Sequence, residues 1–336
     1  MCLSPFFRVQ PKRCLSPFLL DLPPTHEYIE GISLGSRIVK PRGRNTLKVM
    51  TKKAKTKAAN LSKYNRILKG VAPYITSFAE DDVNLSDHFK LALKAAFIKA
   101  YELCVAATQG DPLKDFFVIT GLRGVCEDYI AFRFISKMHP LEKAEIVKLK
   151  VQEEVFKSSI AQWDFFRENH ANQILYYQPD FPKQLDDVQT KLKSLMGVHL
   201  KGKKATMPTV FYMAEQTNLI ALYKYLYHAS SSLVHFNPRM LLRMGWGDLP
   251  GINFSVSNFT VYYQQFGLFY SVYLFRDLLC FLNEEGFATE IASESKALTD
   301  LLNKENRWPE LVTFEEMNIG TLAKLLSFKA PGEPTE

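Results

Sequence analysis

A basic and an acidic side chain lie four residues apart in an otherwise apolar stretch of this chain. Arg123 and Glu127 share a helical stripe with Ile119, Ile130 and Phe134. Side chains at positions i and i+4 of a helix can contact each other, so the two charged groups can pair. Because an isolated buried charge is costly, we expect this pair to face the interior together with a further polar partner.

A second polar pattern closes a long helical stretch much later in the chain. Tyr227, Ser231 and His235 occupy successive i+4 positions, so a phenol, a hydroxyl and an imidazole can form a ladder along one helix face. Imidazole is the side chain that exchanges protons near neutral pH. We therefore expect Arg123 and Glu127 to meet this face in one buried network.

Two interpretations of this network stay open on the sequence alone. In the catalytic one, His235 is the general acid and base, while Tyr227 and Ser231 polarise or position the reacting groups. Arg123 then holds an anionic group such as a phosphate, and Glu127 orients Arg123. The expected partner is RNA or a nucleotide, with the 2′-hydroxyl of the RNA as the nucleophile. In the structural interpretation, the same groups satisfy one another and lock the register of two helices.

Familiar catalytic and cofactor motifs are missing from the sequence. It holds no P-loop, no G-x-G-x-x-G, no H-E-x-x-H and no G-x-S-x-G. The five cysteines show no paired spacing and no cluster with histidine: Cys2, Cys14, Cys104, Cys126 and Cys280. We therefore expect no metal and no cofactor, and the scattered cysteines favour a reducing, cytoplasmic compartment.

The net charge of +7 is distributed unevenly. Twelve of the 42 basic residues lie between positions 31 and 79, and none of the 35 acidic residues does. Residues 80–336 hold 27 basic and 32 acidic residues, which gives them a net charge of −5. A domain of this sign is not a general phosphate-binding surface, although a local basic groove is compatible with it.

Helical patterns separated by short breaks fill the sequence after about residue 61. We expect helices near 85–109, 113–138, 141–177, 182–197, 207–235 and 256–284, with smaller ones after them. No alternating strand pattern with hairpin turns is present. The prediction is an all-α fold, a single multi-helix bundle with mostly short antiparallel connections, over residues 50–330.

The first 49 residues differ in composition from the rest. They repeat Cys-Leu-Ser-Pro-Phe at 2–6 and 14–18, contain six prolines and develop no apolar period. We expect residues 1–49 to be a disordered leader or a mis-called start, with Met50 as the true first residue. Residues 331–336 are expected to be a frayed tail.

The most apolar stretch, Phe266–Leu282, is short for a bilayer and contains Arg276 and Asp277. We therefore expect no membrane association. The sequence is compatible with a protein partner or a homo-oligomer, but it identifies neither.

An Arg-x-x-x-Glu helix, followed much later by Tyr-x-x-x-Ser-x-x-x-His with Pro238 close behind, resembles a prokaryotic family, the domain of unknown function 5677. Pro208 and the run Met213-Ala214-Glu215 fit the same pattern. The resemblance covers roughly residues 85–285. It implies an all-α fold and carries no established activity.

The arrangement is also similar to the HEPN group of helical ribonucleases and toxins, whose motif sets an Arg about four to six residues before a His on one helix. No Arg precedes His235 at that spacing, and Arg167 is too close to His170, so an Arg would have to come from another helix. This similarity implies a metal-independent ribonuclease or a toxin-type effector of a defence system. A non-catalytic binding or scaffold protein is the alternative.

Overall fold

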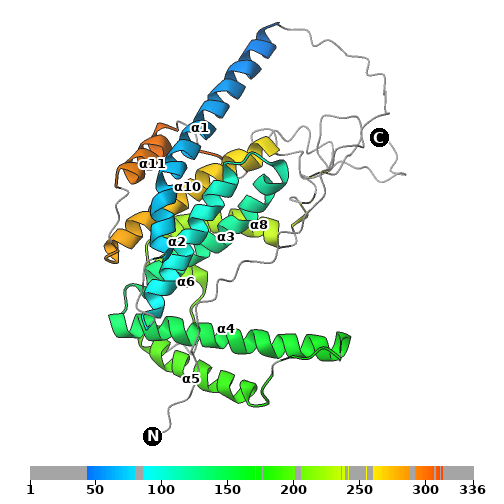
Figure 1. Cartoon of the computed structure of the whole chain (residues 1–336), viewed down its shortest axis with the longest axis vertical. Coiled ribbons are helices and arrows are strands. Elements are labelled where there is room, and N and C mark those ends of the chain that lie inside the picture. Colours follow the sequence, from blue (N-terminus) through cyan, green and yellow to red (C-terminus); the bar gives the residue numbers. More distant parts are fainter. Residues whose placement is uncertain are drawn as a thin grey trace, which may run out of the picture. The chain divides into compact units, whose positions relative to one another are not determined.

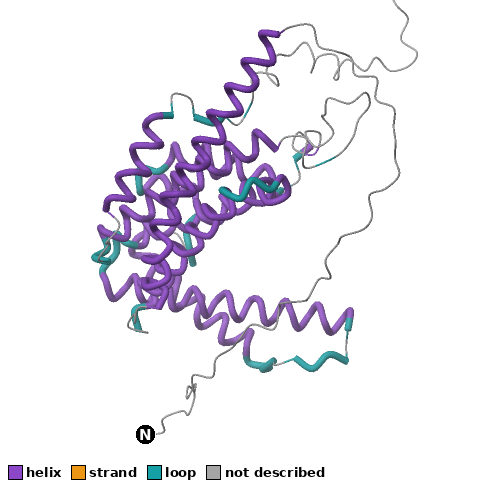
Figure 2. The backbone as a smooth tube through the Cα atoms, turned by 45° about the horizontal axis from the view of Figure 1, so that its top comes forward, coloured by secondary structure: helices purple, strands orange, loops and turns teal. Residues whose placement is uncertain are grey.

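The computed structural model describes residues 44–80, 86–170, 172–175, 177–200, 206–235, 237–238, 241, 255, 260–287, 292–305, 308–310 and 312. Its helices are α1 (Arg44–Glu80), α2 (His88–Ala107), α3 (Pro112–Ile135), α4 (Pro140–Asn169), α5 (Phe181–His199), α6 (Val210–Gln216), α7 (Ile220–Leu222), the π-helix η1 (Tyr223–Tyr227), α8 (His228–Val234), α10 (Thr260–Glu284) and α11 (Ala292–Lys304) (Figure 1). No strand occurs among the described residues (Figure 2). The predicted all-α fold is confirmed.

The core is built around α3 and α10, which pack against each other and both against α2. Phe97 of α2 stacks on Phe275 of α10 with ring centroids 5.0 Å apart, and both side chains are fully buried. The close approach of α10 to α3 depends on Gly267, because a Cβ atom there would lie 2.9 Å from Cγ1 of Val118. Packing on two sides fixes the rotation of α3, the helix that carries Arg123.

Helix α10 is also long and apolar enough to cross a membrane, over Tyr262–Glu284. In this structure, 72% of its most apolar window is buried inside the domain. Such burial is typical of a core helix, whose apolar sides contact other helices.

Helix α1 begins at Arg44 and runs through Met50 without a break. Its later turns join the core, where Leu68 is buried and the hydroxyl of Tyr101 donates a hydrogen bond to the Leu68 carbonyl at 3.2 Å. Part of the expected leader is therefore helical, because residues 44–49 belong to α1.

The chain divides into two compact units, residues 1–52 and 53–336. Residues 1–43 and the expected tail at 331–336 lie outside the described residues. The domain limits at 50 and 330 stay predictions.

Two predicted helix starts are explained by local residues. Asp87 directly precedes α2, and its side chain accepts a hydrogen bond from the backbone N–H of Lys90 at 3.1 Å. At the next loop, Pro140 occupies the first turn of α4, where a missing N–H carries no penalty. The predicted extension of this helix to about residue 177 is wrong, because α4 ends at Asn169.

The predicted single helix over 207–235 is also wrong. It breaks after α6, where the hydroxyl of Thr217 donates to the carbonyl of Met213 at 2.8 Å and Asn218 adopts a left-handed φ of +59°. Short polar side chains tolerate both features, which end a helical ladder. The chain restarts as α7 and passes through η1 into α8, so the rotation of Tyr227 differs from that on one continuous helix.

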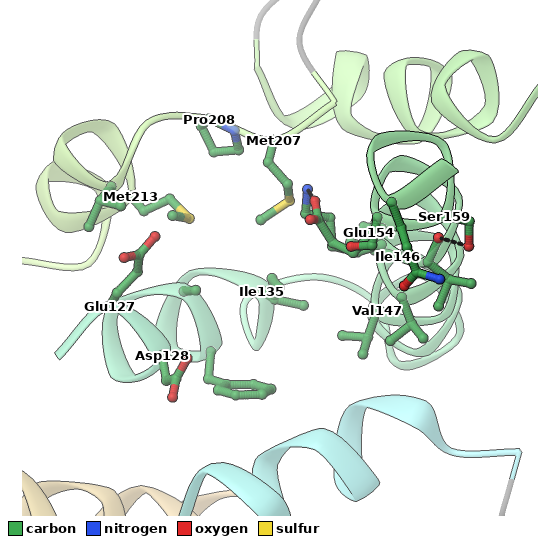
Figure 3. Close-up of a pocket in the computed structure, with 18 residues that line it drawn as sticks. Glu127, Asp128, Ile135, Ile146, Val147, Glu154, Ser159, Met207, Pro208 and Met213 are labelled. Carbon is green, nitrogen blue, oxygen red and sulfur yellow. Dashed lines mark hydrogen bonds and ion pairs between the residues drawn. The ribbon is translucent and has the colours of Figure 1, made fainter. Parts of the chain in front are cut away.

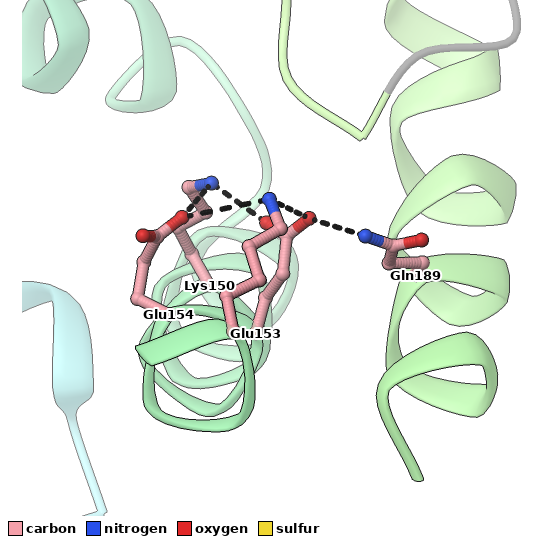
Figure 4. A network of polar contacts seen from close by, with 5 residues as sticks. Lys150, Glu153, Glu154 and Gln189 are labelled. Atoms are coloured by element: carbon pink, nitrogen blue, oxygen red, sulfur yellow. Dashed lines mark hydrogen bonds and ion pairs between the residues drawn. The ribbon is translucent and has the colours of Figure 1, made fainter. Parts of the chain in front are cut away.

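Helices α4 and α5 pack against each other around a buried carboxylate, that of Glu153. This group accepts hydrogen bonds from Lys150 at 2.6 Å and Gln189 at 3.1 Å, and it pairs with Lys157 at 2.8 Å (Figure 4). Burial raises the pKa of Glu153, but the hydrogen bonds from Lys150 and Lys157 outweigh it and hold the pKa at about 2. The carboxylate is therefore ionised at neutral pH and links the two helices.

Candidate functional site

Tyr227 is presented by the π-helical turn η1. A π-turn holds one more residue than an α-turn and occurs often at functional sites. Buried Leu226 anchors the turn in the core, while Tyr223 and Tyr227 stack with ring centroids 4.8 Å apart and an interplanar angle of 19°. The turn therefore places two parallel phenol rings beside α3.

Arg123 extends from α3 to both Tyr227 of η1 and His235 at the end of α8. Its Nη1 lies 2.6 Å from Nε2 of His235, and its Nη2 donates to the Tyr227 hydroxyl at 3.2 Å. The guanidinium carbon also lies 5.3 Å from the centroid of the Tyr227 ring, in cation–π contact. The structure thus brings together three of the five side chains that the sequence singled out: Arg123, Tyr227 and His235.

His235 occupies the C-terminal end of α8, where the backbone turns extended with φ −95° and ψ 161°. Its amide still donates to the carbonyl of Ser231 at 3.0 Å, so the residue is tied to the last helical turn while its side chain is exposed. A guanidinium can only donate, so Nε2 of His235 acts as the acceptor in this contact, and the ring proton is assigned to Nδ1.

The hydroxyl of Ser231 lies one helical turn from both Tyr227 and His235. Its Oγ is buried and has no hydrogen-bond partner among the described residues. The neighbouring serines behave differently, because Ser230 donates to the Leu226 carbonyl at 2.7 Å and Ser232 donates to the Ala229 carbonyl at 2.6 Å. Ser231 therefore keeps a buried donor that is unused among the described residues.

Glu127 departs from its expected role. It makes no hydrogen bond or ion pair with another described residue, and its side chain lines a pocket between α3 and α4 (Figure 3). The expectation of one buried network was wrong as well, because Arg123 is only partly buried and His235 is exposed. Water can solvate charges at such positions, so Arg123 and Glu127 are not forced to pair.

The guanidinium of Arg123 keeps unused capacity for an anion. Contacts with Tyr227 and His235 occupy two of its five N–H groups, which leaves three. No carboxylate among the described residues forms an ion pair with Arg123. The site therefore contains a partly exposed positive charge beside a phenol and an imidazole. Planar guanidinium groups bind oxyanions through two parallel hydrogen bonds, so an oxyanion is the ligand that this arrangement favours.

Tyr223 belongs to the site although sequence reasoning did not select it. Its stacking on Tyr227 was signalled by the i, i+4 spacing of the two tyrosines. Phe211 of α6 also meets the Tyr223 ring edge-on, with ring centroids 5.6 Å apart. Arg123, Tyr227, Tyr223 and Phe211 are therefore linked by successive contacts: one cation–π, one stacked and one edge-on. Among the described residues, no group of three or more His, Cys, Asp and Glu side chains could hold a metal ion.

One comparison with known proteins matches the central part of the chain. Residues 96–249 match the model of a family described as Family of unknown function (DUF5677). The match supports the resemblance that the two polar patterns indicated. The matched segment contains all five side chains of those patterns, from Arg123 to His235. No curated protein and no solved structure gave a match.

Proposed function

We propose that Arg123, Tyr227 and His235 bind a phosphate group of RNA and cleave the RNA strand without a metal ion, as a toxin-type ribonuclease does. The observation that carries this proposal is the contact of one guanidinium with both the Tyr227 hydroxyl and Nε2 of His235. The sequence has no Arg at the required spacing before His235 on the same helix. In the structure, Arg123 of α3 takes that place beside His235 at the end of α8. The exposed position of His235 gives a substrate access to the imidazole.

The chemistry needs one proton carrier and one anion-binding group. A phosphate oxygen accepts from Arg123, whose N–H groups then shift from the imidazole to the anion and free Nε2 of His235. Nε2 takes the proton of the 2′-hydroxyl as that oxygen attacks phosphorus. The bond from phosphorus to the 5′-oxygen breaks, and His235 returns the proton to the leaving oxygen. The products are a 2′,3′-cyclic phosphate and a 5′-hydroxyl, so no water or cofactor is consumed.

Two hydroxyls support the transition state in this scheme. The phenol of Tyr227 is already held by Arg123 at 3.2 Å and donates to a non-bridging phosphate oxygen. The hydroxyl of Ser231 is buried and has no partner among the described residues, so it would donate to the developing oxyanion only after the substrate displaces the groups that cover it. Donors fixed in advance at the place where charge develops are worth more than donors that must reorganise.

The test is cleavage of an RNA oligonucleotide by the purified full-length chain, with the all-DNA oligonucleotide as substrate control. We expect RNA alone to be cut, with a 2′,3′-cyclic phosphate product, and His235→Ala to lower the rate by about 10²–10⁴-fold. His228→Asn is the matched control, because His228 is exposed at the start of the same helix and should retain full activity. Toxicity on expression should follow the same order of variants.

A binding role without catalysis is the second candidate, favoured by the net charge of −5 over residues 80–336. In that case the contacts of Arg123 only hold α3 against η1 and α8. The parent chain would then cut no RNA and cause no toxicity, and His235→Ala would change only the free energy of unfolding. An inactive parent, or a folded His235→Ala protein that cuts as fast as the parent, would refute the ribonuclease proposal.

A further inference from the structure

The groove between α3 and α4 forms a pocket of about 810 Å³, closed on a third side by the segment that leads into α6 (Figure 3). This volume lies within the range of about 300–1,000 Å³ that small-molecule sites occupy. Most of the lining is apolar, including Ile135, Ile146, Met207 and Met213. Methionine side chains adapt to irregular ligands, so two of them on one wall favour an apolar body of variable shape.

Charged side chains line the same pocket, and all but one are already paired. Asp128 pairs with Lys99 at 2.9 Å, and Glu154 pairs with Lys150 at 2.7 Å. Glu127 lines the pocket without an ion pair to any described residue. The pocket therefore presents one uncompensated negative charge beside an apolar surface.

Lys150 is the basic residue of the lining, and it is committed to two carboxylates. It lies 2.6 Å from Glu153 and 2.7 Å from Glu154. Burial lowers the pKa of Lys150, but its hydrogen bonds to Glu153 and Glu154 outweigh this and raise it, so the side chain stays charged and paired. The pocket thus disfavours an anionic ligand, because the Glu127 carboxylate is unpaired and the Lys150 ammonium is already paired with Glu153 and Glu154.

We propose that this pocket binds a small organic cation with an apolar body, such as an arylalkylamine. The ammonium group would donate to the carboxylate of Glu127, and the hydrocarbon part would contact Ile135, Met207 and Met213. A charge-assisted hydrogen bond is stronger than a neutral one, which gives an amine its advantage over a neutral compound of equal size. This site is separate from the phosphate site, because Glu127 forms no hydrogen bond or ion pair with Arg123 and the pocket lining lacks Tyr227 and His235.

Calorimetric titration of the full-length chain at neutral pH tests the proposal with three matched probes: phenylbutylamine, phenylbutanol and phenylpentanoate. We expect the amine to bind at least about 10-fold more tightly than the alcohol, and the carboxylate to bind most weakly. Glu127→Gln keeps the shape of the side chain and should remove the preference for the amine while leaving the alcohol unchanged. Glu145→Gln is the control, because Glu145 is a partly exposed carboxylate of α4 outside the lining.

A second variant separates binding in the pocket from binding elsewhere. Ala131 lines the pocket on α3, so Ala131→Phe fills it and should weaken the amine and the alcohol alike, by about 10-fold or more. Equal affinity of the parent for amine and alcohol would overturn the proposal. So would a Glu127→Gln protein that keeps the preference, or a folded Ala131→Phe protein that binds the amine as the parent does.

Discussion

Replacement of Glu153 by Gln should destabilise the chain at neutral pH and make its stability less dependent on acid. The carboxylate is fully buried and is held by Lys150, Lys157 and Gln189. Burial opposes ionisation, yet the hydrogen bonds from the lysines lower the pKa from 4.5 to about 2. Each tenfold change in proton affinity is worth about 1.4 kcal/mol, so ionised Glu153 contributes about 3 kcal/mol to the free energy of unfolding.

The sign of the pH dependence follows from the lowered pKa. The unfolded chain takes up a proton on Glu153 below about pH 4.5, whereas the folded chain does so only near pH 2. The contribution is therefore fully present above about pH 5 and is lost as the pH falls towards 2, with roughly 2 kcal/mol gone at about pH 3. Other carboxylates titrate in this window, so the informative quantity is the difference between the parent and Glu153→Gln.

Urea unfolding followed by circular dichroism, at about pH 6 and about pH 3, measures this difference. We expect Glu153→Gln to be less stable than the parent by about 3 kcal/mol at the higher pH and by about 1 kcal/mol at the lower one. Glu145→Gln serves as the control, because the ion pair of Glu145 with Lys148 on α4 is partly exposed to solvent and should be worth less than about 1 kcal/mol. If the stability difference between the parent and Glu153→Gln is the same at both pH values, ionisation of Glu153 does not stabilise the fold.

Three further results are expected. Arg123→Ala should cost about 1–2 kcal/mol in urea unfolding, less than the roughly 3–5 kcal/mol of a buried ion pair, because its side chain is partly exposed. Gly267→Ala should lower the free energy of unfolding by about 1–3 kcal/mol, since the new Cβ meets Val118 at 2.9 Å, and a second change, Val118→Ala, should recover part of this loss. In native alkylation followed by mass spectrometry, exposed Cys280 should react well before Cys104, whose burial raises the pKa of its thiol.

Helices were predictable wherever their signals are local. Asp87 caps α2, Pro140 lies in the first turn of α4, and the apolar periods of α2 and α3 give their buried faces. The break inside 207–235 was missed because Thr217 and Asn218 are compatible with a helix interior as well as with its end. Their hydrogen bonding and backbone conformation become visible only in the folded chain.

The sequence predicted which side chains form the candidate site better than it predicted which of them contact each other. The spacing of Tyr227, Ser231 and His235 placed them on one face, and the cost of a lone charge suggested that Arg123 would meet them. The structure shows the contact of Arg123 with Tyr227 and His235, but it turns Glu127 into the pocket between α3 and α4. The i, i+4 rule gives only which side chains can meet, not which neighbour each one selects.

Periodicity and residue type are local properties, so they were enough to predict the helical class of this protein and the polar side chains on its apolar faces. Three features appear only in the folded chain: Arg123 contacts His235 across two helices, Ser231 keeps an unused hydroxyl, and Glu127 faces a separate pocket. These features depend on how each helix is rotated about its axis. Packing of α3 against α2 and α10, with Gly267 permitting the close approach of α10, fixes the direction of each side chain on α3. The π-turn η1 changes the rotation of the residues that face α3.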